Sequence, residues 1–341
     1  MAGDGFDGTI ETVRGSLAGE RREELLRFWD DEAGFGGQAA EQRLGEVVCL
    51  ALDSDGRIAG VNSAYADAVP LIGGRRFWIY RSLLSDRAAG AGPAMIKAAF
   101  AALERESDQA GEGPLGIVLL DPSVGEDSPL AVWPQTQMLF AGYDGAGTPV
   151  RIRYFDDAAV GPAHEHAITT QQMRELVITL EDDYRVVELA ETDEVSNDDV
   201  IAFWEREGAV AGEEAQRRVN EVQLVGIEER TGIAAVSTGY LQRSSQLRMD
   251  VWYYRAFVGK AHRQKSIASY FAVQGIGHME QRFIEGTDTR GAGVIFEIEN
   301  NFLKTFLNKG QWLPSDFTFI GENERGDHIR VHYFRGAEVP R

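Results

Sequence analysis

The sequence predicts an α/β protein with α+β mixed sheets, built from two tandem copies of one domain. Three observations favour this fold class. Matched residue pairs recur at a nearly constant distance, the same succession of strand-like and helix-like segments occurs in each half, and 341 residues suit about two domains. Hydrophobic residues make up 43% of the chain, which is enough for each copy to bury a core.

The internal repeat has an offset of 175 residues at first, 174 in the middle and 179 near the end, as small loop insertions would produce. The matched pairs are Phe28-Trp29 with Phe203-Trp204, Arg43 with Arg218, Glu46-Val47 with Glu221-Val222, Ile58-Ala59 with Ile233-Ala234, Tyr65 with Tyr240, Trp78 with Trp252, Tyr80-Arg81 with Tyr254-Arg255, Arg151 with Arg330, and Tyr154-Phe155 with Tyr333-Phe334. A unit this long is a whole domain and not a solenoid repeat. We therefore expect domains at 1–160 and 178–341, joined by a linker at 161–177.

The elements of the two copies follow one order. A short strand (9–14; 184–189) precedes a helix that carries the repeated Phe-Trp pair. Three strand-like runs follow, over 46–52, 58–66 and 76–84 in the first copy and 221–228, 232–241 and 248–258 in the second. Next come a long helix (93–106; 267–283), a buried strand (116–120; 293–298) and a closing strand (150–155; 328–334). This mixture predicts a mixed sheet with helices on both faces.

Two local patterns support these elements. Ser196 followed by Asp199 resembles a capping box at the start of the second copy's first helix. The single cysteine, Cys49, lies in an apolar run, so it is expected in the core and excludes an intrachain disulfide.

The net charge and the apolar content of the chain restrict the classes of partner and the location that we expect. The net charge is −20 and the pI is about 4.7, so we expect neither a nucleic acid nor an anionic membrane as partner. No apolar stretch approaches the length of a membrane span, and the first residues do not resemble a signal peptide. These features predict a cytoplasmic protein; they leave its oligomeric state open.

An anion-binding loop is predicted between the fourth strand and the long helix of each copy. The first copy has Arg87-x-x-Gly90-x-Gly92, and the second has Arg263-x-x-Ser266-x-Ala268. A helix N-terminus offers unpaired N–H groups and a positive dipole end, small residues let the backbone approach an anion, and arginine adds charge. The sequence lacks the Gly-Lys-Ser/Thr ending of a P-loop and the Gly-x-Gly-x-x-Gly of a Rossmann site.

With this loop in this order of elements, the chain resembles the GCN5-related N-acetyltransferase (GNAT) superfamily, present as a tandem pair. The resemblance implies that the loop holds the pyrophosphate of acetyl-CoA, or of another acyl-CoA, and that the pantetheine arm pairs with the preceding strand where it separates from the next. The residues it assigns to the cofactor are Leu84, Arg87, Ala88, Ala89, Gly90, Ala91 and Gly92 in the first copy, and Val258, Arg263, Gln264, Lys265, Ser266, Ile267, Ala268 and Asn301 in the second.

The chain departs from the family pattern in both copies. The first loop is two residues shorter than the second, measured from Trp78 and Trp252. In the second copy, Phe306 stands where the family often has a tyrosine that acts as the general acid. We therefore expect one copy to be catalytic and the other structural or degenerate, without deciding which.

Acetyl transfer to an amine needs a base. Glu297 and Glu299 are candidates because they share one face of a strand opposite Phe296 and Ile298, and Asp250 at the start of another strand is a third. Tyr254 is the candidate acid. His164 and His166 have no third ligand nearby in the sequence, so we expect no metal. Two other interpretations stay open. The chain also resembles the Fem-type aminoacyl transferases, which use aminoacyl-tRNA, and it could be a GNAT-fold sensor or binding protein without chemistry.

Overall fold

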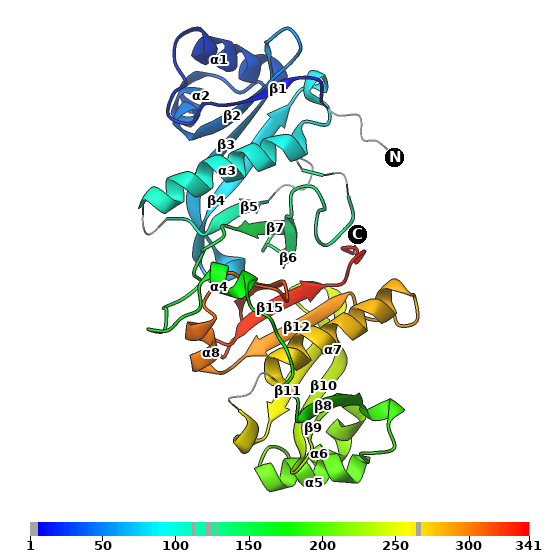
Figure 1. Ribbon diagram of the computed structural model, residues 1–341. Coiled ribbons are helices and arrows are strands. Elements are labelled where there is room, and N and C mark those ends of the chain that lie inside the picture. The colour runs from blue at the N-terminus through cyan, green and yellow to red at the C-terminus, as the bar shows by residue number, and fades with distance from the viewer. Residues whose placement is uncertain (1–5, 111–112, 121–124, 127, 264–266, 341) are drawn as a thin grey trace. The chain divides into compact units, whose positions relative to one another are not determined.

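The computed structural model describes residues 6–110, 113–120, 125, 126, 128–263 and 267–340, and the chain divides into two compact units, Met1–Val160 and Gly161–Arg341 (Figure 1). Each unit is a twisted mixed sheet with helices on both faces, so the predicted fold class is confirmed. The helices and strands of the first unit recur in the same order in the second, which also has α4, α8 and β13.

The first unit forms one sheet in the order β1-β2-β3-β4-β5-β7-β6. Its elements are β1 (Thr9–Thr12), α1 (Gly19–Ala33), α2 (Gly37–Arg43), β2 (Val47–Leu52), β3 (Ile58–Val69), β4 (Arg75–Leu84), α3 (Gly92–Ala110), β5 (Gly116–Leu119), β6 (Leu139–Tyr143) and β7 (Pro149–Tyr154). Neighbouring strands are antiparallel except β4 and β5, which are parallel and therefore need the crossover that α3 supplies.

The second unit forms a sheet in the order β13-β14-β15-β12-β11-β10-β9-β8. Its elements are α4 (Thr170–Arg174), β8 (Tyr184–Glu188), α5 (Asn197–Glu207), α6 (Gly212–Arg218), β9 (Val222–Glu228), β10 (Gly232–Ser244), β11 (Met249–Val258), α7 (Ile267–Ile284), β12 (Gly293–Ile298), α8 (Asn301–Phe306), β13 (Gln311–Trp312), β14 (Phe317–Glu322) and β15 (His328–Tyr333). Here β11 and β12 are the parallel pair and α7 is the crossover.

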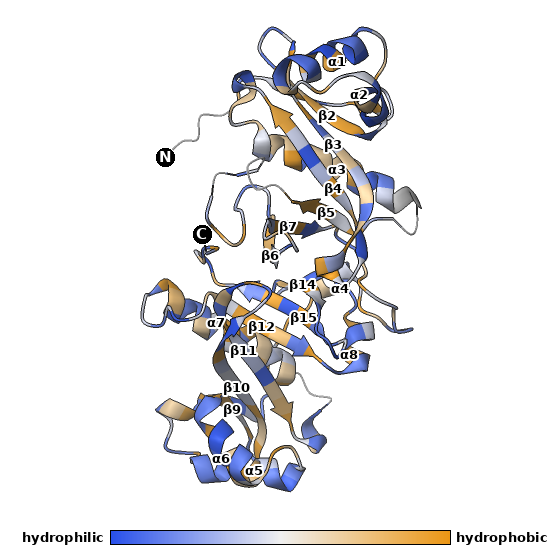
Figure 2. Cartoon of the chain, turned by 180° about the vertical axis from the view of Figure 1, so that it is seen from behind, coloured by the Kyte–Doolittle hydropathy of each residue, from blue (hydrophilic) through white to orange (hydrophobic). Residues whose placement is uncertain are grey.

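Each sheet is covered on both faces by apolar helix surfaces. In the first unit, α3 packs Met95, Ile96 and Ala99 against one face, and α1 packs Phe28 and Trp29 against the other. The second unit repeats this with α7 and α5, and the repeated pair Phe203-Trp204 is buried on α5. The outer surfaces of α5 and α6 are mainly hydrophilic, whereas the buried strand β2 is hydrophobic (Figure 2).

Several local predictions agree with the structure. Ser196 and Asp199 form a reciprocal capping box at the start of α5. Cys49 is fully buried. Within the described ranges, no helix combines the length and apolar character that crossing a bilayer requires.

Some elements differ from the prediction. The short helices α2, α6 and α8 and the strands β6 and β14 are absent from the order of elements predicted above. The second unit includes residues 161–177, where α4 buries Met173 in a core with Trp252 and Phe334. Main-chain hydrogen bonds also join this segment to α8, from His164 to Thr305 and from Ile168 to Phe306.

Candidate active site at the parallel strand pair

The parallel ladder of each unit is shorter than the long strand that takes part in it. In the second unit the ladder between β11 and β12 consists of two residue pairs, Trp252–Val294 and Tyr253–Ile295, although β11 continues to Val258 and β12 to Ile298. In the first unit the ladder between β4 and β5 stops at Tyr80–Leu119, and β4 continues to Leu84. In both units the long strand, β4 or β11, therefore continues without a parallel partner on the side where the predicted anion loop follows, and we call this unpaired region the opening. Leu84 and Val258, the last residues of the two long strands, are half-buried there.

The loop of the first unit is a 3₁₀ turn over Asp86–Ala88 followed by α3. Gly90 has φ 81°, a conformation that favours glycine, and Pro93 follows the first helical residue, Gly92. Ala88, Ala91 and Gly92 are buried, whereas Ala89 and Gly90 are exposed. The main-chain N–H groups of Ala89 and Ala91 donate to Asp86 and Ala88 within the loop.

The Arg87 side chain already makes an ion pair and a hydrogen bond within the first unit. Its Nη1 lies 2.5 Å from a carboxylate oxygen of Asp53, and its Nη2 donates to the carbonyl of Ile58 at 2.9 Å. Hydrogen bonds from the main chain at Arg57 and from Arg87 hold the pKa of Asp53 below its ordinary value. The side chain therefore points to the β2–β3 turn, a contact that the loop motif did not predict.

The loop of the second unit is only partly described, because Gln264, Lys265 and Ser266 lie outside the described residues. Arg263 is exposed, and its Nε donates to the carbonyl of Val258 over a long 3.4 Å contact. Before it, buried His262 shares a 2.6 Å hydrogen bond with the hydroxyl of Tyr184. After the gap, Ile267 is buried under α7 and Ala268 is exposed in the first turn.

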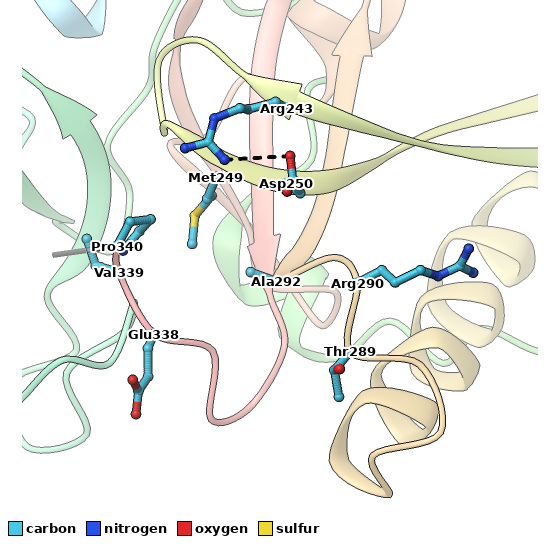
Figure 3. A pocket seen from close by; sticks show the side chains of 9 residues that line it. All are labelled: Arg243, Met249, Asp250, Thr289, Arg290, Ala292, Glu338, Val339 and Pro340. Atoms are coloured by element: carbon cyan, nitrogen blue, oxygen red, sulfur yellow. Dashed lines mark ion pairs between the residues drawn. The ribbon is translucent and has the colours of Figure 1, made fainter.

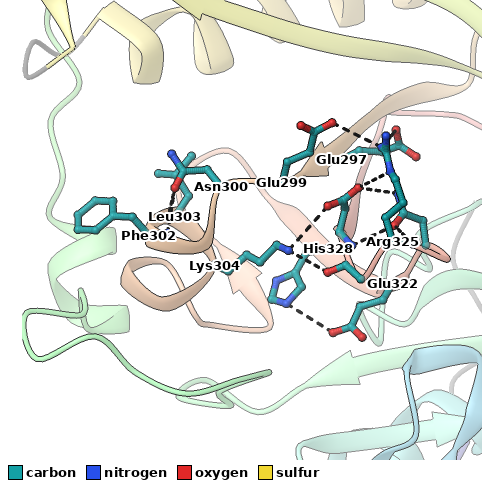
Figure 4. Close-up of polar contacts among 12 residues, drawn as sticks. Glu297, Glu299, Asn300, Phe302, Leu303, Lys304, Glu322, Arg325 and His328 are labelled. Carbon is teal, nitrogen blue, oxygen red and sulfur yellow. Dashed lines mark hydrogen bonds and ion pairs between the residues drawn. The ribbon is translucent and has the colours of Figure 1, made fainter.

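Glu297 and Glu299 lie beside the opening of the second unit. Phe296 and Ile298 face the core under α7, so the two glutamates point to the opposite face, as their spacing predicts. Arg325, on the turn between β14 and β15, lies 3.9 Å from Glu297 and 3.5 Å from Glu299 (Figure 4). The Glu297 side chain is 33% exposed and that of Glu299 is 73% exposed, so Glu297 is the more enclosed of the two.

A tyrosine pair continues this face toward the neighbouring strands. Tyr253 on β11 and Tyr240 on β10 are register partners, and their half-buried rings stack with centroids 5.4 Å apart. Burial, with a further contribution from Glu297, raises the pKa of both phenols. Arg255 lies over the Tyr240 ring at 4.4 Å and donates to its hydroxyl at 2.9 Å. We call Tyr240, Tyr253, Glu297 and Glu299 the carboxylate–tyrosine cluster.

Tyr254 is not part of this cluster, which corrects its assignment as the candidate acid. It points to the α7 face, it is 3% exposed, and its hydroxyl donates to the carbonyl of Phe271 at 3.0 Å. Burial places its pKa far above the ordinary value. Tyr80 is buried in the matched position of the first unit, under α3, with its hydroxyl accepting from Asn62. The repeated tyrosine therefore bonds the crossover helix directly in the second unit, whereas in the first unit Asn62 of β3 donates both to Tyr80 and to the carbonyl of Met95 on α3.

The first unit has only part of this cluster. Arg81 lies over the ring of Tyr65 at 4.5 Å and pairs with Glu46, matching Arg255, Tyr240 and Glu221. By the repeat offsets and the strand registers, however, Ile79 takes the place of Tyr253 and Leu120 takes that of Glu297. The carboxylate and the second ring are therefore particular to the second unit.

The remaining candidates lie near α8. Asn301 is an exposed residue in the first turn of that helix, and its carbonyl accepts from Thr305. Phe306 stacks on Phe302 with centroids 5.3 Å apart. Half-buried His164 packs its ring against Phe302. Over the described ranges, no group of three or more His, Cys, Asp or Glu side chains is arranged to hold a metal ion.

A cavity of about 500 Å³ lies at the other end of β11 (Figure 3). Asp250, next to the first residue of that strand, lines it together with Arg243, Arg290 and the tail at Glu338. None of the four residues of the carboxylate–tyrosine cluster lines this cavity, so the cavity is not part of the cluster.

Sequence reasoning missed Tyr253 and Arg325 as site residues. Tyr253 could have been found by comparing the copies, because Ile79 stands at its matched position. Arg325 comes to the site from a turn between two strands, one of which was not predicted, and no motif marks it.

Comparisons with known proteins give similarity in solved structures alone. No protein-family model and no curated protein matches the chain. It is similar to a GNAT-family acetyltransferase from Streptococcus pneumoniae (12% identity, 45% of this chain and 99% of that one, TM-score 0.33). It is also similar to the GNAT-family N-acetyltransferase YhbS from Escherichia coli, solved in complex with CoA (11%, 46% and 87%, TM-score 0.30). A third match is Eis1 from Mycobacterium abscessus (16%, 77% and 62%, TM-score 0.22), of which the chain spans less than two thirds.

Proposed function

We propose that this chain is an acyl-CoA-dependent N-acyltransferase with two tandem GNAT-like domains, in which the second domain is catalytic and the first is structural. The reaction would transfer an acetyl or other acyl group to an amine of a small molecule or protein. One observation carries the choice of domain. Glu297 and Tyr253 flank the opening between β11 and β12, and Leu120 and Ile79 replace them in the first domain.

The residues at this opening fit an acyl-CoA. Beyond Tyr253, β11 has no ladder partner on the β12 side, so an extended amide-containing arm has main-chain groups to pair with. Arg263 is exposed at the end of that strand and can meet a phosphate, whereas Arg87 in the first domain is held by Asp53. When bound, the acyl-CoA supplies a thioester carbonyl.

Glu297 provides the proton acceptor that the reaction needs. An amine is mostly protonated near neutral pH, so one proton must leave before its nitrogen lone pair can attack. Glu297 would take that proton, directly or through one water. As the C–N bond forms and the C–S bond breaks, the second proton leaves nitrogen and the thiolate becomes a thiol. The products are an amide and free CoA, and one proton is released to solvent.

A turnover assay with matched variants tests this proposal. The full chain is incubated with acetyl-CoA and a panel of primary amines, and release of free thiol is followed. We expect Glu297→Gln to lower kcat by about 100-fold, within the range for loss of a general base. Leu120→Gln places the same side chain at the matched position of the first domain and should leave kcat unchanged.

Two results would overturn the proposal. One is equal loss of activity in both variants, which would remove the asymmetry between the domains. The other is binding of acetyl-CoA without turnover of any amine, which would favour a sensor protein of the same fold.

A further inference from the structure

Arg325 contacts Glu297 and Glu299 in a way that a ligand can replace. Its Nη2 lies 3.9 Å and 3.5 Å from the two carboxylates, and its side chain is 64% exposed. Exposed ion pairs of this kind contribute little free energy, because water and salt screen them. An incoming cation can therefore take the place of the guanidinium at small cost.

The guanidinium of Arg325 also contacts a third carboxylate, through Nε. Its Nε lies 2.9 Å from Asp327, which is buried and also accepts a hydrogen bond from Asn323 at 3.0 Å. Lys304 adds a second cation 3.8 Å from Asp327 and donates to the carbonyl of Gly326 (Figure 4). The Nη2 atom of the same planar guanidinium faces the two glutamates, so a rotation that moves Nη2 away from them also moves Nε away from Asp327. Asp327 then keeps its contacts with Asn323 and Lys304, and the rotation requires no movement of the strands.

The tyrosine rings offer a flat surface next to these carboxylates. Tyr253 and Tyr240 stack with an interplanar angle of 23°, and Glu297 is near enough to disfavour ionisation of both phenols. The Arg255 guanidinium on the Tyr240 ring shows that a planar cation lies well on this surface. Tyr253 is the ring nearer to β12, and so to Glu297.

We propose that the acceptor is a primary ammonium compound with an aromatic group a short chain away. Its ammonium would replace Arg325 at Glu297 and Glu299, and its ring would lie against Tyr253. This inference rests on the proposed function for the reaction, but the binding it describes does not require turnover. Arg325 is then a positioning residue that keeps the two carboxylates paired when no acceptor is bound.

Calorimetric titration of the full chain with tyramine and with propylamine, with and without CoA, tests the inference. Tyramine should bind more tightly than propylamine. Arg325→Gln should tighten tyramine binding about two- to fivefold, the factor equivalent to an exposed ion pair. Tyr253→Leu should weaken tyramine binding about three- to tenfold and leave propylamine unchanged, whereas Tyr253→Phe should retain tyramine binding.

Arg185→Gln is the matched control, because Arg185 is an exposed arginine of the same unit paired with Glu194 at 2.5 Å, and its removal should change nothing. Equal affinity for the two amines, or no effect of either Arg325→Gln or Tyr253→Leu, would overturn the inference. Tyramine binding that follows the expected pattern without any thiol release would instead retain the subsite and overturn the proposed reaction.

Discussion

Arg330 holds its guanidinium carbon 3.9 Å from the ring centroid of Trp312, and both side chains are buried. Arg330 also donates to the carbonyls of Lys309 and Gly310, at 2.7 Å and 3.3 Å. Arg151 repeats this arrangement over Trp133 at 4.2 Å and donates to the carbonyls of Leu130 and Ala131. The repeated arginines Arg151 and Arg330 therefore have a structural role, because each donates hydrogen bonds to the carbonyls of an irregular segment.

Replacing Arg330 by methionine should destabilise the protein by about 3 kcal/mol, because buried carbonyls lose their donors and a cation–π contact is removed. Denaturant unfolding followed by circular dichroism measures this change. Arg230→Met is the control, since that side chain is 85% exposed and should alter stability little. Equal unfolding midpoints for the two variants would contradict the structural role of Arg330.

Tyr254→Phe should cost about 0.5–1.5 kcal/mol of stability, because the buried hydrogen bond to the carbonyl of Phe271 on α7 is lost. Activity per folded molecule should stay within about twofold, since the hydroxyl faces α7 and not the carboxylate–tyrosine cluster. Steady-state kinetics alongside thermal unfolding separate the two effects. A large fall in kcat with unchanged stability would return Tyr254 to the role of acid.

Alkaline pH should destabilise the fold through its buried tyrosines. Burial raises the pKa of Tyr80 and Tyr254 well above the ordinary value of 10, and that of Tyr240 and Tyr253 more modestly. Because the folded-state pKa is the higher one, this stabilisation is complete below the unfolded pKa and is lost as pH rises above it. Absorbance titration should show some tyrosines ionising late, together with unfolding. Ionisation of all ten in one step near pH 10, with the fold intact, would refute this.

The two loop arginines should differ in their effect on CoA binding. Arg263→Ala should weaken binding by about 10- to 100-fold, the loss of a charge-assisted contact. Arg87→Ala should change it by less than twofold, because that side chain pairs with Asp53 and the carbonyl of Ile58. Calorimetry should give one site per chain. Two sites, each lost with its own arginine, would show that both loops bind.

Periodicity and repetition predicted the parts of the fold whose signal is local. The long crossover helices and the central strands are apolar runs of sufficient length, and the Ser196–Asp199 cap is a short-range pattern. The helix at 37–43 was missed because it is short, polar and begins with glycine, so its sequence has little helical signal. The strand at 139–143 has five residues, and its place next to β7 at the end of the strand order depends on pairing that no local pattern encodes.

The same limit applies to the candidate site. The shared face of Glu297 and Glu299 follows from strand alternation and was predicted. The contact of Arg325 with them joins residues 26 or more positions apart through a turn, and the Tyr240–Tyr253 stack depends on strand register. Tyr254 was chosen as the acid because it recurs in both copies, but neighbouring residues of a strand point to opposite faces, and Tyr254 points toward α7.

The short parallel ladders also determine how each sheet can flex. Three residue pairs join β4 to β5, and two join β11 to β12. Few main-chain hydrogen bonds therefore connect the two parts of each sheet, and we call the line between these parts the seam. The crossover helix that spans the seam must hold the two parts together, which it does through side chains more than through main-chain bonds. A ligand arm that pairs with the unpaired part of β4 or β11 would add main-chain hydrogen bonds next to the seam. Occupancy would then stiffen the sheet, and amide hydrogen exchange along the seam would slow in whichever unit is filled.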